Sequence, residues 1–198
     1  MPGSTASSSV AHSSSAAVSL VANELLRAAE RTAVVAASAL DDLADALLAA
    51  DRVFLLGAGR SGIALRMTAM RLMHLGLDVH VVGEPTAPAI RAGDLLLTAS
   101  GSGGTESVVR AARTASGEGA SVAAITTDAG STLGRLADVV IAVPAAQKLD
   151  RSAAASRQYA GSLFEQLVVV IGDGLFHAMW GRQGTSADEL WPRHANLE

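Results

Sequence analysis

A loop in the middle of the chain combines hydroxyl side chains with glycines. Glycines let the backbone approach an anion closely, and hydroxyl and free N–H groups donate hydrogen bonds to its oxygen atoms. This donor set suits a terminal phosphate monoester, which predicts a phosphate-binding loop made of Ser100, Gly101, Ser102, Gly103, Gly104 and Thr105. The alternative is a serine-rich turn in which Ser102 or Thr105 only caps a helix.

A second glycine-rich loop, Gly57 to Gly62, contains Arg60 and Ser61. Its spacing fits the dinucleotide-binding fingerprint, and Glu84 lies where a ribose-binding acid would follow the next strand. A dinucleotide enzyme would also need room for a substrate domain, which a chain of 198 residues does not leave, so we do not expect a nicotinamide cofactor. A tight strand-to-helix turn without a ligand is the remaining interpretation of these glycines.

The elements that would position these loops alternate between strands and helices. Buried strands are predicted where short apolar runs end in small or polar residues, at 53–56, 79–82, 95–98, 122–126 and 139–143. Helical periodicity marks 18–48, 63–75, 106–116, a short segment at 133–137, and 158–180, which we expect to end near Gly181. The pattern predicts an α/β fold: one doubly wound domain with a five-stranded parallel sheet flanked by helices. Both loops would then lie at the carboxyl edge of the sheet, where ligands collect.

Composition limits the classes of function. The length predicts one domain, residues 18–198, after a Ser/Ala-rich tail at 1–17 that we expect to be disordered and that lacks the features of a secretory signal. A net charge of −4 and 3% aromatic residues argue against nucleic acid as a partner. Charges and glycines interrupt the apolar stretches, so no membrane span is expected, and the absence of cysteine fits the cytoplasm. A small polar ligand is favoured.

Several motifs, taken in order, resemble one family. They are GAGRSG at 57–62, MRLMHLG at 70–76, SGSGGTES at 100–107, FEQ at 164–166 and RHANL at 193–197. Together they resemble the sugar isomerase (SIS) domain family, and within it the 6-phospho-3-hexuloisomerases. The resemblance implies a cofactor-independent and metal-free isomerase that interconverts D-arabino-hex-3-ulose 6-phosphate and fructose 6-phosphate, a step of the ribulose monophosphate pathway of formaldehyde metabolism. It also implies a homo-oligomer, a tetramer or a dimer, with sites near subunit boundaries.

The resemblance also suggests roles for single residues. Glu165 matches the family's proton acceptor, and its apolar neighbours would make the carboxylate a stronger base; the alternative is a solvent-facing helix charge. His74 and His194 are candidates for opening the sugar ring or passing a proton, with His194 reaching a site in a neighbouring subunit, although His74 could simply suit a helix C-terminus. Ser61 and Arg60 join the hydroxyl loop in binding phosphate or balancing the enediolate charge.

Two other functions remain open at this stage. A different SIS isomerase, acting for example on arabinose 5-phosphate or sedoheptulose 7-phosphate, would share the fold and the phosphate loop. A phosphosugar-sensing module would bind such a ligand without turning it over, and would be indifferent to replacement of Glu165.

Overall fold

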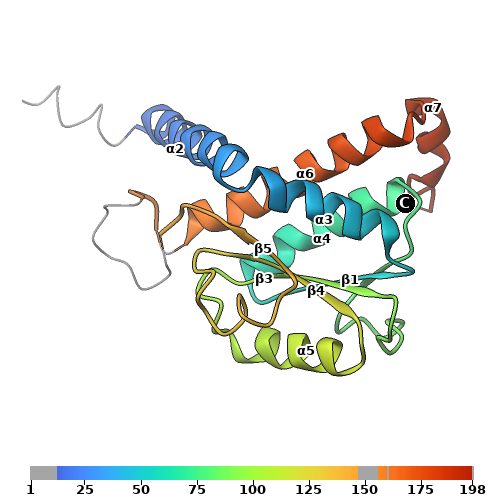
Figure 1. Cartoon of the computed structure of the whole chain (residues 1–198). Helices are drawn as coiled ribbons and strands as arrows, with labels where there is room; N and C mark the ends of the chain where they lie inside the picture. Colours follow the sequence, from blue (N-terminus) through green and yellow to red (C-terminus); the bar gives the residue numbers. More distant parts are fainter. Residues whose placement is uncertain (1–12, 147–155, 160, 198) are drawn as a thin grey trace, which may run out of the picture.

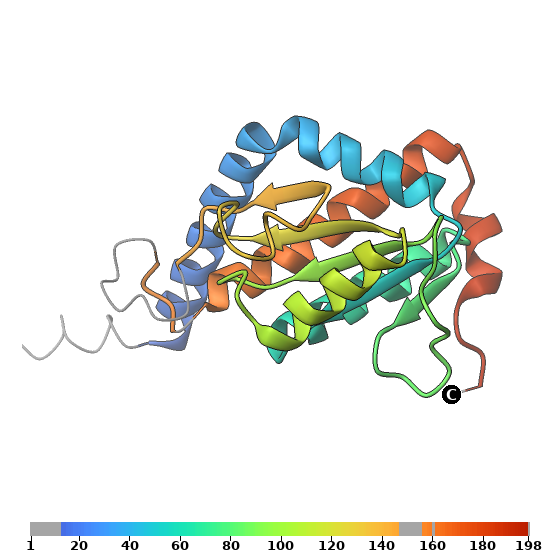
Figure 2. The same ribbon diagram turned by 60° about the horizontal axis from the view of Figure 1, so that its bottom comes forward.

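The fold is a three-layer arrangement with a parallel sheet between two layers of helices (Figure 1). The computed structural model describes residues 13–146, 156–159 and 161–197. Helices α2, α3, α4 and α6 lie on one face of the sheet, and α5 lies on the other (Figures 1 and 2). The predicted doubly wound α/β class is therefore confirmed.

The sheet has five parallel strands in the order β2-β1-β3-β4-β5. Their bounds are β1 Val53–Gly57, β2 Val79–Val81, β3 Leu95–Ala99, β4 Ser121–Thr126 and β5 Val139–Ala142. All five coincide with the predicted strands to within a residue or so. Their side chains alternate between two cores: Leu55 and Leu97 face the larger helical layer, whereas Phe54 and Leu96 face α5.

The helices differ from the predictions mainly at their ends. Their bounds are α2 Ser14–Val35, α3 Ala37–Ala49, α4 Arg60–His74, α5 Glu106–Gly117, α6 Ser162–Gln183 and α7 Ala187–Leu190, followed by the 3₁₀ turn η1 Trp191–Arg193. Helix α2 begins four residues before the predicted start at Val18, because the Ser13 hydroxyl accepts a hydrogen bond from the Ala16 amide and caps it. Residues 1–12 of the predicted tail lie outside the described residues.

Two local predictions were wrong. Residues 133–136 form turns instead of a short helix; the Leu133 amide donates to the Gly103 carbonyl, and Gly134 packs against the Ala129 backbone. Helix α6 continues through Gly181 and ends at Gly184, whose left-handed conformation (φ 66°) closes the helix.

Helix α6 is long and apolar enough to cross a membrane by length and composition, but it is a core helix. Leu167, Val168 and Ile171 are buried in the larger core, where α6 packs along α4. Gly172 permits this close packing, since a Cβ atom there would overlap the Thr68 hydroxyl on α4.

Candidate functional site

The two predicted loops meet at the topological switch point of the sheet, which lies between β1 and β3. Strands β1 and β3 are neighbours, with Gly57 paired with Ala99 at their carboxyl ends. The chain leaves β1 into α4 on one face and leaves β3 into α5 on the other, so the loops diverge and leave a crevice between them. The fold therefore places both loops where open α/β sheets bind ligands.

A cavity of about 520 Å³ occupies this position. Its lining combines both loops with the start of α6: Ala58, Gly59, Arg60, Ser61, Ala99, Ser100, Gly101, Ser102, Thr105, Ala146, Tyr159, Gly161, Ser162, Phe164 and Glu165. The structure thus brings Glu165 to the predicted phosphate loop, although 60 positions separate Glu165 from Thr105 in the chain. The volume suits a small polar molecule.

Three helices point their N-termini at this cavity. Helix α4 begins at Arg60 after Gly59, α5 begins after Thr105, and α6 begins at Ser162 after Gly161. Each N-terminus presents free N–H groups and a partial positive charge. Their convergence favours an anionic ligand in the cavity.

Arg60 and Glu165 form an ion pair across the cavity, between the guanidinium Nε and carboxylate Oε2. The Glu165 side chain is 17% exposed, whereas the Arg60 side chain is 67% exposed. The carboxylate is therefore largely enclosed, whereas the arginine extends toward solvent and can turn toward a ligand. Glu165 is not the solvent-facing helix charge that the sequence left open.

The hydroxyl loop is anchored by its own hydrogen bonds and by the loop after β4. The Ser100 and Thr105 hydroxyls lie 2.9 Å apart, and the Thr127 hydroxyl donates to the Gly101 carbonyl at 2.8 Å. A Cβ atom at Gly101 would lie 3.5 Å from the Phe164 ring, so the loop packs directly on the start of α6. Loop and carboxylate are thereby held in one arrangement.

Gly103 and Gly104 differ from the other loop members. Gly103 is buried with a φ of +58°, and a Cβ atom there would overlap the Ser131 side chain. Gly104 is exposed, and its amide donates to the Ser102 hydroxyl at 3.3 Å. Within the described part of the chain neither glycine lines the cavity, and only Gly103 has a conformation and close neighbours that require glycine.

The glycines of the first loop are explained by close packing within the turn. A Cβ atom at Gly57 would lie 2.7 Å from the Gly62 amide nitrogen, and one at Gly62 would overlap the Gly57 carbonyl. These two glycines let β1 turn sharply into α4. Arg60 and Ser61 are left facing the cavity.

His74 and His194 lie together but away from this cavity. Their rings are 4.1 Å apart between centroids, and the Arg193 guanidinium donates to the His74 carbonyl at 3.0 Å. His74 ends α4 and Arg60 begins it, so a rise of 1.5 Å per residue separates them by about 20 Å. Within one chain, neither histidine reaches Glu165.

His74 is buried and electrostatically disfavoured as a cation. Burial lowers the pKa of His74, and the nearby His194 and Arg71 lower it further. Its Nδ1 atom is buried without a hydrogen-bond partner among the described residues. His74 is therefore neutral near pH 7, and the exposed His194 ring covers it.

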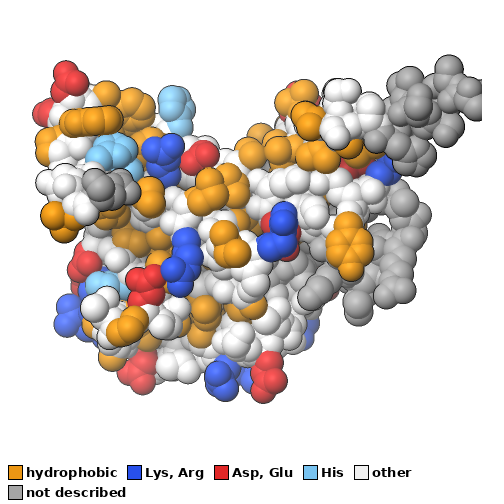
Figure 3. All heavy atoms as spheres, turned by 180° about the vertical axis from the view of Figure 1, so that it is seen from behind, with side chains coloured by type: hydrophobic (Ala, Val, Ile, Leu, Met, Phe, Trp, Pro, Cys, Tyr) orange, Lys and Arg blue, Asp and Glu red, His pale blue; other side chains and the backbone are white. Residues whose placement is uncertain are grey.

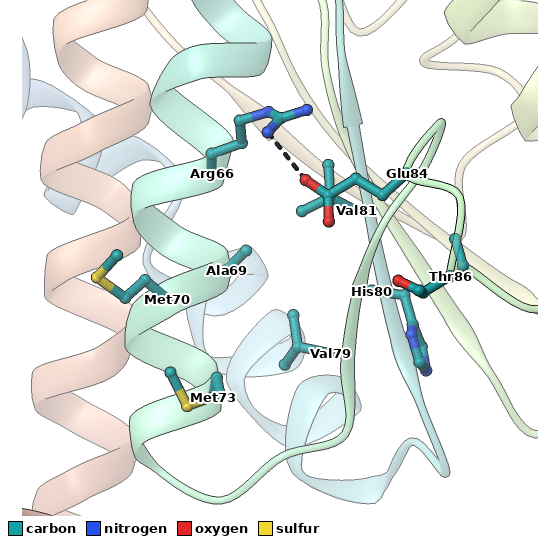
Figure 4. Close-up of a pocket in the computed structure, with 10 residues that line it drawn as sticks. Arg66, Ala69, Met70, Met73, Val79, His80, Val81, Glu84 and Thr86 are labelled. Carbon is teal, nitrogen blue, oxygen red and sulfur yellow. Dashed lines mark hydrogen bonds and ion pairs between the residues drawn. The ribbon is translucent and has the colours of Figure 1, made fainter. Parts of the chain in front are cut away.

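Glu84 and Thr86 line a different cavity, of about 310 Å³, between α4 and β2 (Figure 4). The Glu84 carboxylate accepts a hydrogen bond from Arg66 at 2.9 Å. The carboxylate that would bind a ribose in a dinucleotide site is therefore hydrogen-bonded to Arg66. Glu84 therefore has a partner on α4 within its own chain.

Among the residues that line this cavity and that the sequence analysis gave no role, three have polar or aromatic side chains: Tyr159, Ser162 and Phe164. Phe164 was quoted within the FEQ motif but received no role. Ser162 follows Gly161 at the start of α6, a glycine-to-helix signal that the predicted start at 158 obscured. Tyr159 carries no local signal beyond being the chain's single tyrosine.

Comparisons with known proteins agree with this architecture. The model of the SIS domain family matches residues 46–170. A 3-hexulose-6-phosphate isomerase from Mycobacterium gastri is 53% identical over 91% of this chain and 89% of its own length. Another from Bacillus subtilis (strain 168) is 37% identical over 91% of this chain and 97% of its own.

Solved structures agree as well. A hypothetical protein from Methanococcus jannaschii, with an inferred molecular function of 3-hexulose-6-phosphate isomerase, superimposes with a TM-score of 0.76 at 32% identity. The match covers 91% of this chain and 98% of that one. The family model and the relatives agree with the fold, and the chain belongs to the SIS domain family.

Proposed function

We propose that this protein is a 3-hexulose-6-phosphate isomerase that interconverts D-arabino-hex-3-ulose 6-phosphate and fructose 6-phosphate. The observation that carries the proposal is the position of the Glu165 carboxylate, which faces the hydroxyl loop across one cavity. The isomerases from Mycobacterium gastri and Bacillus subtilis named above support the choice of substrate. We place the enzyme in the cytoplasm, because a chain without cysteine needs no oxidising compartment.

The phosphate group occupies the side of the cavity formed by the hydroxyl loop. Ser100, Ser102 and Thr105 donate through hydroxyls, together with Ser61 and the free amides at the N-termini of α4 and α5. Anchoring the phosphate at this end directs the sugar carbons toward Glu165. Binding energy at the phosphate thereby orients the reacting carbons.

Glu165 then moves one proton. Its carboxylate takes the proton from carbon 2 of the 3-ketose, the electron pair forms the carbon 2 to carbon 3 double bond, and oxygen 3 gains negative charge. The hydroxyl proton of oxygen 2 then passes to oxygen 3, and return of the proton from Glu165 to carbon 3 leaves the carbonyl at carbon 2, which gives the 2-ketose. Arg60 stabilises the enediolate, because its exposed guanidinium lies beside the carboxylate and can turn toward that charge.

A second copy of the chain supplies the histidine, His74 or His194, that opens the sugar ring or passes a proton. Ile63, Met67, Met70 and Met73 are exposed along one face of α4, and Figure 3 shows hydrophobic side chains gathered on this side of the molecule. Met67 lies seven residues from both Arg60 and His74, the two ends of α4. Antiparallel packing of two α4 helices about a two-fold axis at Met67 sets the His74 and His194 pair of one copy beside Arg60 of the other.

The first experiment is a coupled assay. A hexulose phosphate synthase makes the 3-hexulose 6-phosphate from formaldehyde and ribulose 5-phosphate, and fructose 6-phosphate is measured as product. We expect Glu165→Gln to lower kcat by at least about 10³-fold, since the base is lost while binding is kept. Glu118→Gln, an exposed carboxylate after α5, is the matched control and keeps full activity.

The outcome also separates the competing functions. No turnover by the wild type, with phosphosugar binding retained, would discard this assignment in favour of a sensor. Turnover on arabinose 5-phosphate or sedoheptulose 7-phosphate instead would identify another isomerase of the family.

Mixing two inactive variants tests the shared site. Glu165→Gln chains keep the histidine, and His194→Ala chains keep the base, so a mixed dimer contains one complete site. We expect the mixture to recover about a quarter of wild-type activity, since half of the dimers are mixed and each has one of two sites intact. No recovery would show that each site is built within a single chain.

A further inference from the structure

Glu24, on helix α2, binds the segment that leads into α6, the helix that carries Glu165. Its carboxylate accepts hydrogen bonds from the Ser156 hydroxyl at 2.8 Å, the Arg157 amide at 3.0 Å and the Gln158 side-chain amide at 3.2 Å. More than 130 residues separate these partners from Glu24 in the chain. One carboxylate thus anchors three consecutive residues of a segment that has no helical or strand hydrogen bonds of its own.

The contacts continue from this segment into the first turn of α6. The Gln158 side chain, held by Glu24, accepts a hydrogen bond from the Gln166 side chain at 2.8 Å. The Ser162 hydroxyl donates to the Tyr159 carbonyl at 2.7 Å. Glu165 lies between Ser162 and Gln166, so both ends of its helical turn are tied to the anchored segment.

Charge strengthens this anchor. Burial opposes ionisation of Glu24, but the Arg157 amide, the Ser156 hydroxyl and the Gln158 amide outweigh it and hold the pKa of Glu24 below its ordinary value. Hydrogen bonds to a carboxylate are stronger than those between neutral groups. The anchor is therefore fully charged at neutral pH.

We propose that Glu24 is a positioning residue for the isomerase reaction, which holds residues 156–159 against α2 and, through Gln158 and Gln166, fixes the Glu165 turn against the phosphate loop. This inference rests on the proposed function. Glu24 does not line the cavity, so it acts through other residues. A general base must keep its distance to the reacting carbon within a fraction of an ångström, which is why a remote anchor affects the rate.

The expected kinetic signature separates kcat from KM. The hydroxyl loop is anchored independently by Thr127 and the loop after β4, so phosphate binding does not depend on Glu24. We expect Glu24→Gln to lower kcat about tenfold with KM changed less than about twofold, because loss of the anchor misplaces the base but not the phosphate. If a variant elsewhere in the protein that loses as much stability also lowered kcat tenfold, the effect of Glu24→Gln would be a general structural one.

Two control variants address that possibility. Glu30→Gln alters an exposed glutamate on the same helix and keeps wild-type kcat. Asp94→Asn weakens a buried ion pair with Arg52 at the opposite, amino-terminal edge of the sheet. It lowers the unfolding temperature but keeps kcat when assayed well below that temperature.

Rescue by exchanging the two side chains provides the most specific test. In the double variant Glu24→Gln with Gln158→Glu, an amide at 24 faces a carboxylate at 158, and that carboxylate still accepts from Gln166. We expect kcat to recover to within about threefold of the wild type, because the link from α2 to α6 is restored. A double variant no better than Glu24→Gln, or a Glu24→Gln kcat equal to the wild type, would overturn the inference.

Hydrogen exchange keeps this test separate from the proposed function. If the wild type shows no isomerase activity, the function is wrong, and the anchor is then judged by amide exchange over 157–166. Glu24→Gln should exchange these amides at least about fivefold faster than wild type, with the 100–105 loop unchanged. Unaltered exchange would contradict the anchor whatever the protein catalyses.

Discussion

Replacing Gly103 with alanine tests how the hydroxyl loop is held. Gly103 has a φ of +58°, which costs a side-chain-bearing residue about 1–2 kcal/mol. The new Cβ atom would also overlap the Ser131 side chain and come within 3.1 Å of the Thr126 hydroxyl. Both neighbours are buried, and overpacking of this kind costs a further 1–3 kcal/mol or so. We expect the variant to lose about 3 kcal/mol of unfolding free energy.

Urea denaturation at fixed protein concentration measures this loss, and the adjacent Gly104 supplies the control. A Cβ atom at Gly104 would have no neighbour closer than 3.9 Å, so Gly104→Ala should change the unfolding free energy by less than about 0.5 kcal/mol. Because the loop must shift to relieve the overlap, Gly103→Ala should also raise KM for the phosphosugar.

A double-variant cycle distinguishes steric overlap from backbone strain. Ser131→Gly removes the atoms that the new Cβ would overlap, at the cost of about 1 kcal/mol for the hydrogen bond from the Gly134 amide to the Ser131 hydroxyl. Combined with Gly103→Ala, it should destabilise the protein by about 1–2 kcal/mol less than the sum of the single changes. Strict additivity would refute the close packing on which the reasoning depends.

Two further predictions concern stability away from the site. Asp94 is buried, and the Arg52 guanidinium and the Arg91 amide outweigh the effect of burial and hold the pKa of Asp94 below its ordinary value. The contribution of Asp94 to stability is therefore complete above its ordinary pKa of about 4 and is lost as the pH falls through the lowered value. Urea titrations should show that Asp94→Asn lowers the free energy of unfolding by about 2 kcal/mol at pH 7, and by less in acid. In α6, Gly172→Ala should lower the thermal midpoint of unfolding, because the new Cβ atom would overlap Thr68. Adding Thr68→Gly to this variant should recover part of the loss. If the single and the double variant had equal midpoints, the close approach of α4 and α6 would be contradicted.

Local sequence patterns determined the loops and the sheet. Each strand was recognisable because an apolar run buried on both faces stands out from its neighbours. Each loop was recognisable because its glycines allow a tight turn and its hydroxyl groups donate hydrogen bonds, which are properties of the residues themselves. Ser100, Ser102, Thr105, Arg60 and Ser61 all line the predicted crevice, since loops that follow neighbouring parallel strands must emerge at the same edge.

Local pattern failed where a distant partner decided the conformation. Residues 133–137 have helical composition, but this short segment packs against distant parts of the chain, and the Leu133 amide donates to the Gly103 carbonyl thirty residues earlier. Helix α6 passes Gly181 because Gly184 offers the left-handed cap, and its favourable packing on α4 outweighs one glycine.

Tertiary structure alone decided how the chemically active groups are grouped. It set Glu165 opposite the hydroxyl loop and paired it with Arg60, and it stacked His74 with His194 at the far end of α4. The sequence by itself determined which residues are able to bind phosphate or transfer a proton, because that ability belongs to each side chain. Only the packing of α4 and α6 on one face of the sheet decided which of them share a cavity, because it brings the start of α6 beside the start of α4, whereas the length of α4 keeps His74 about 20 Å from Arg60.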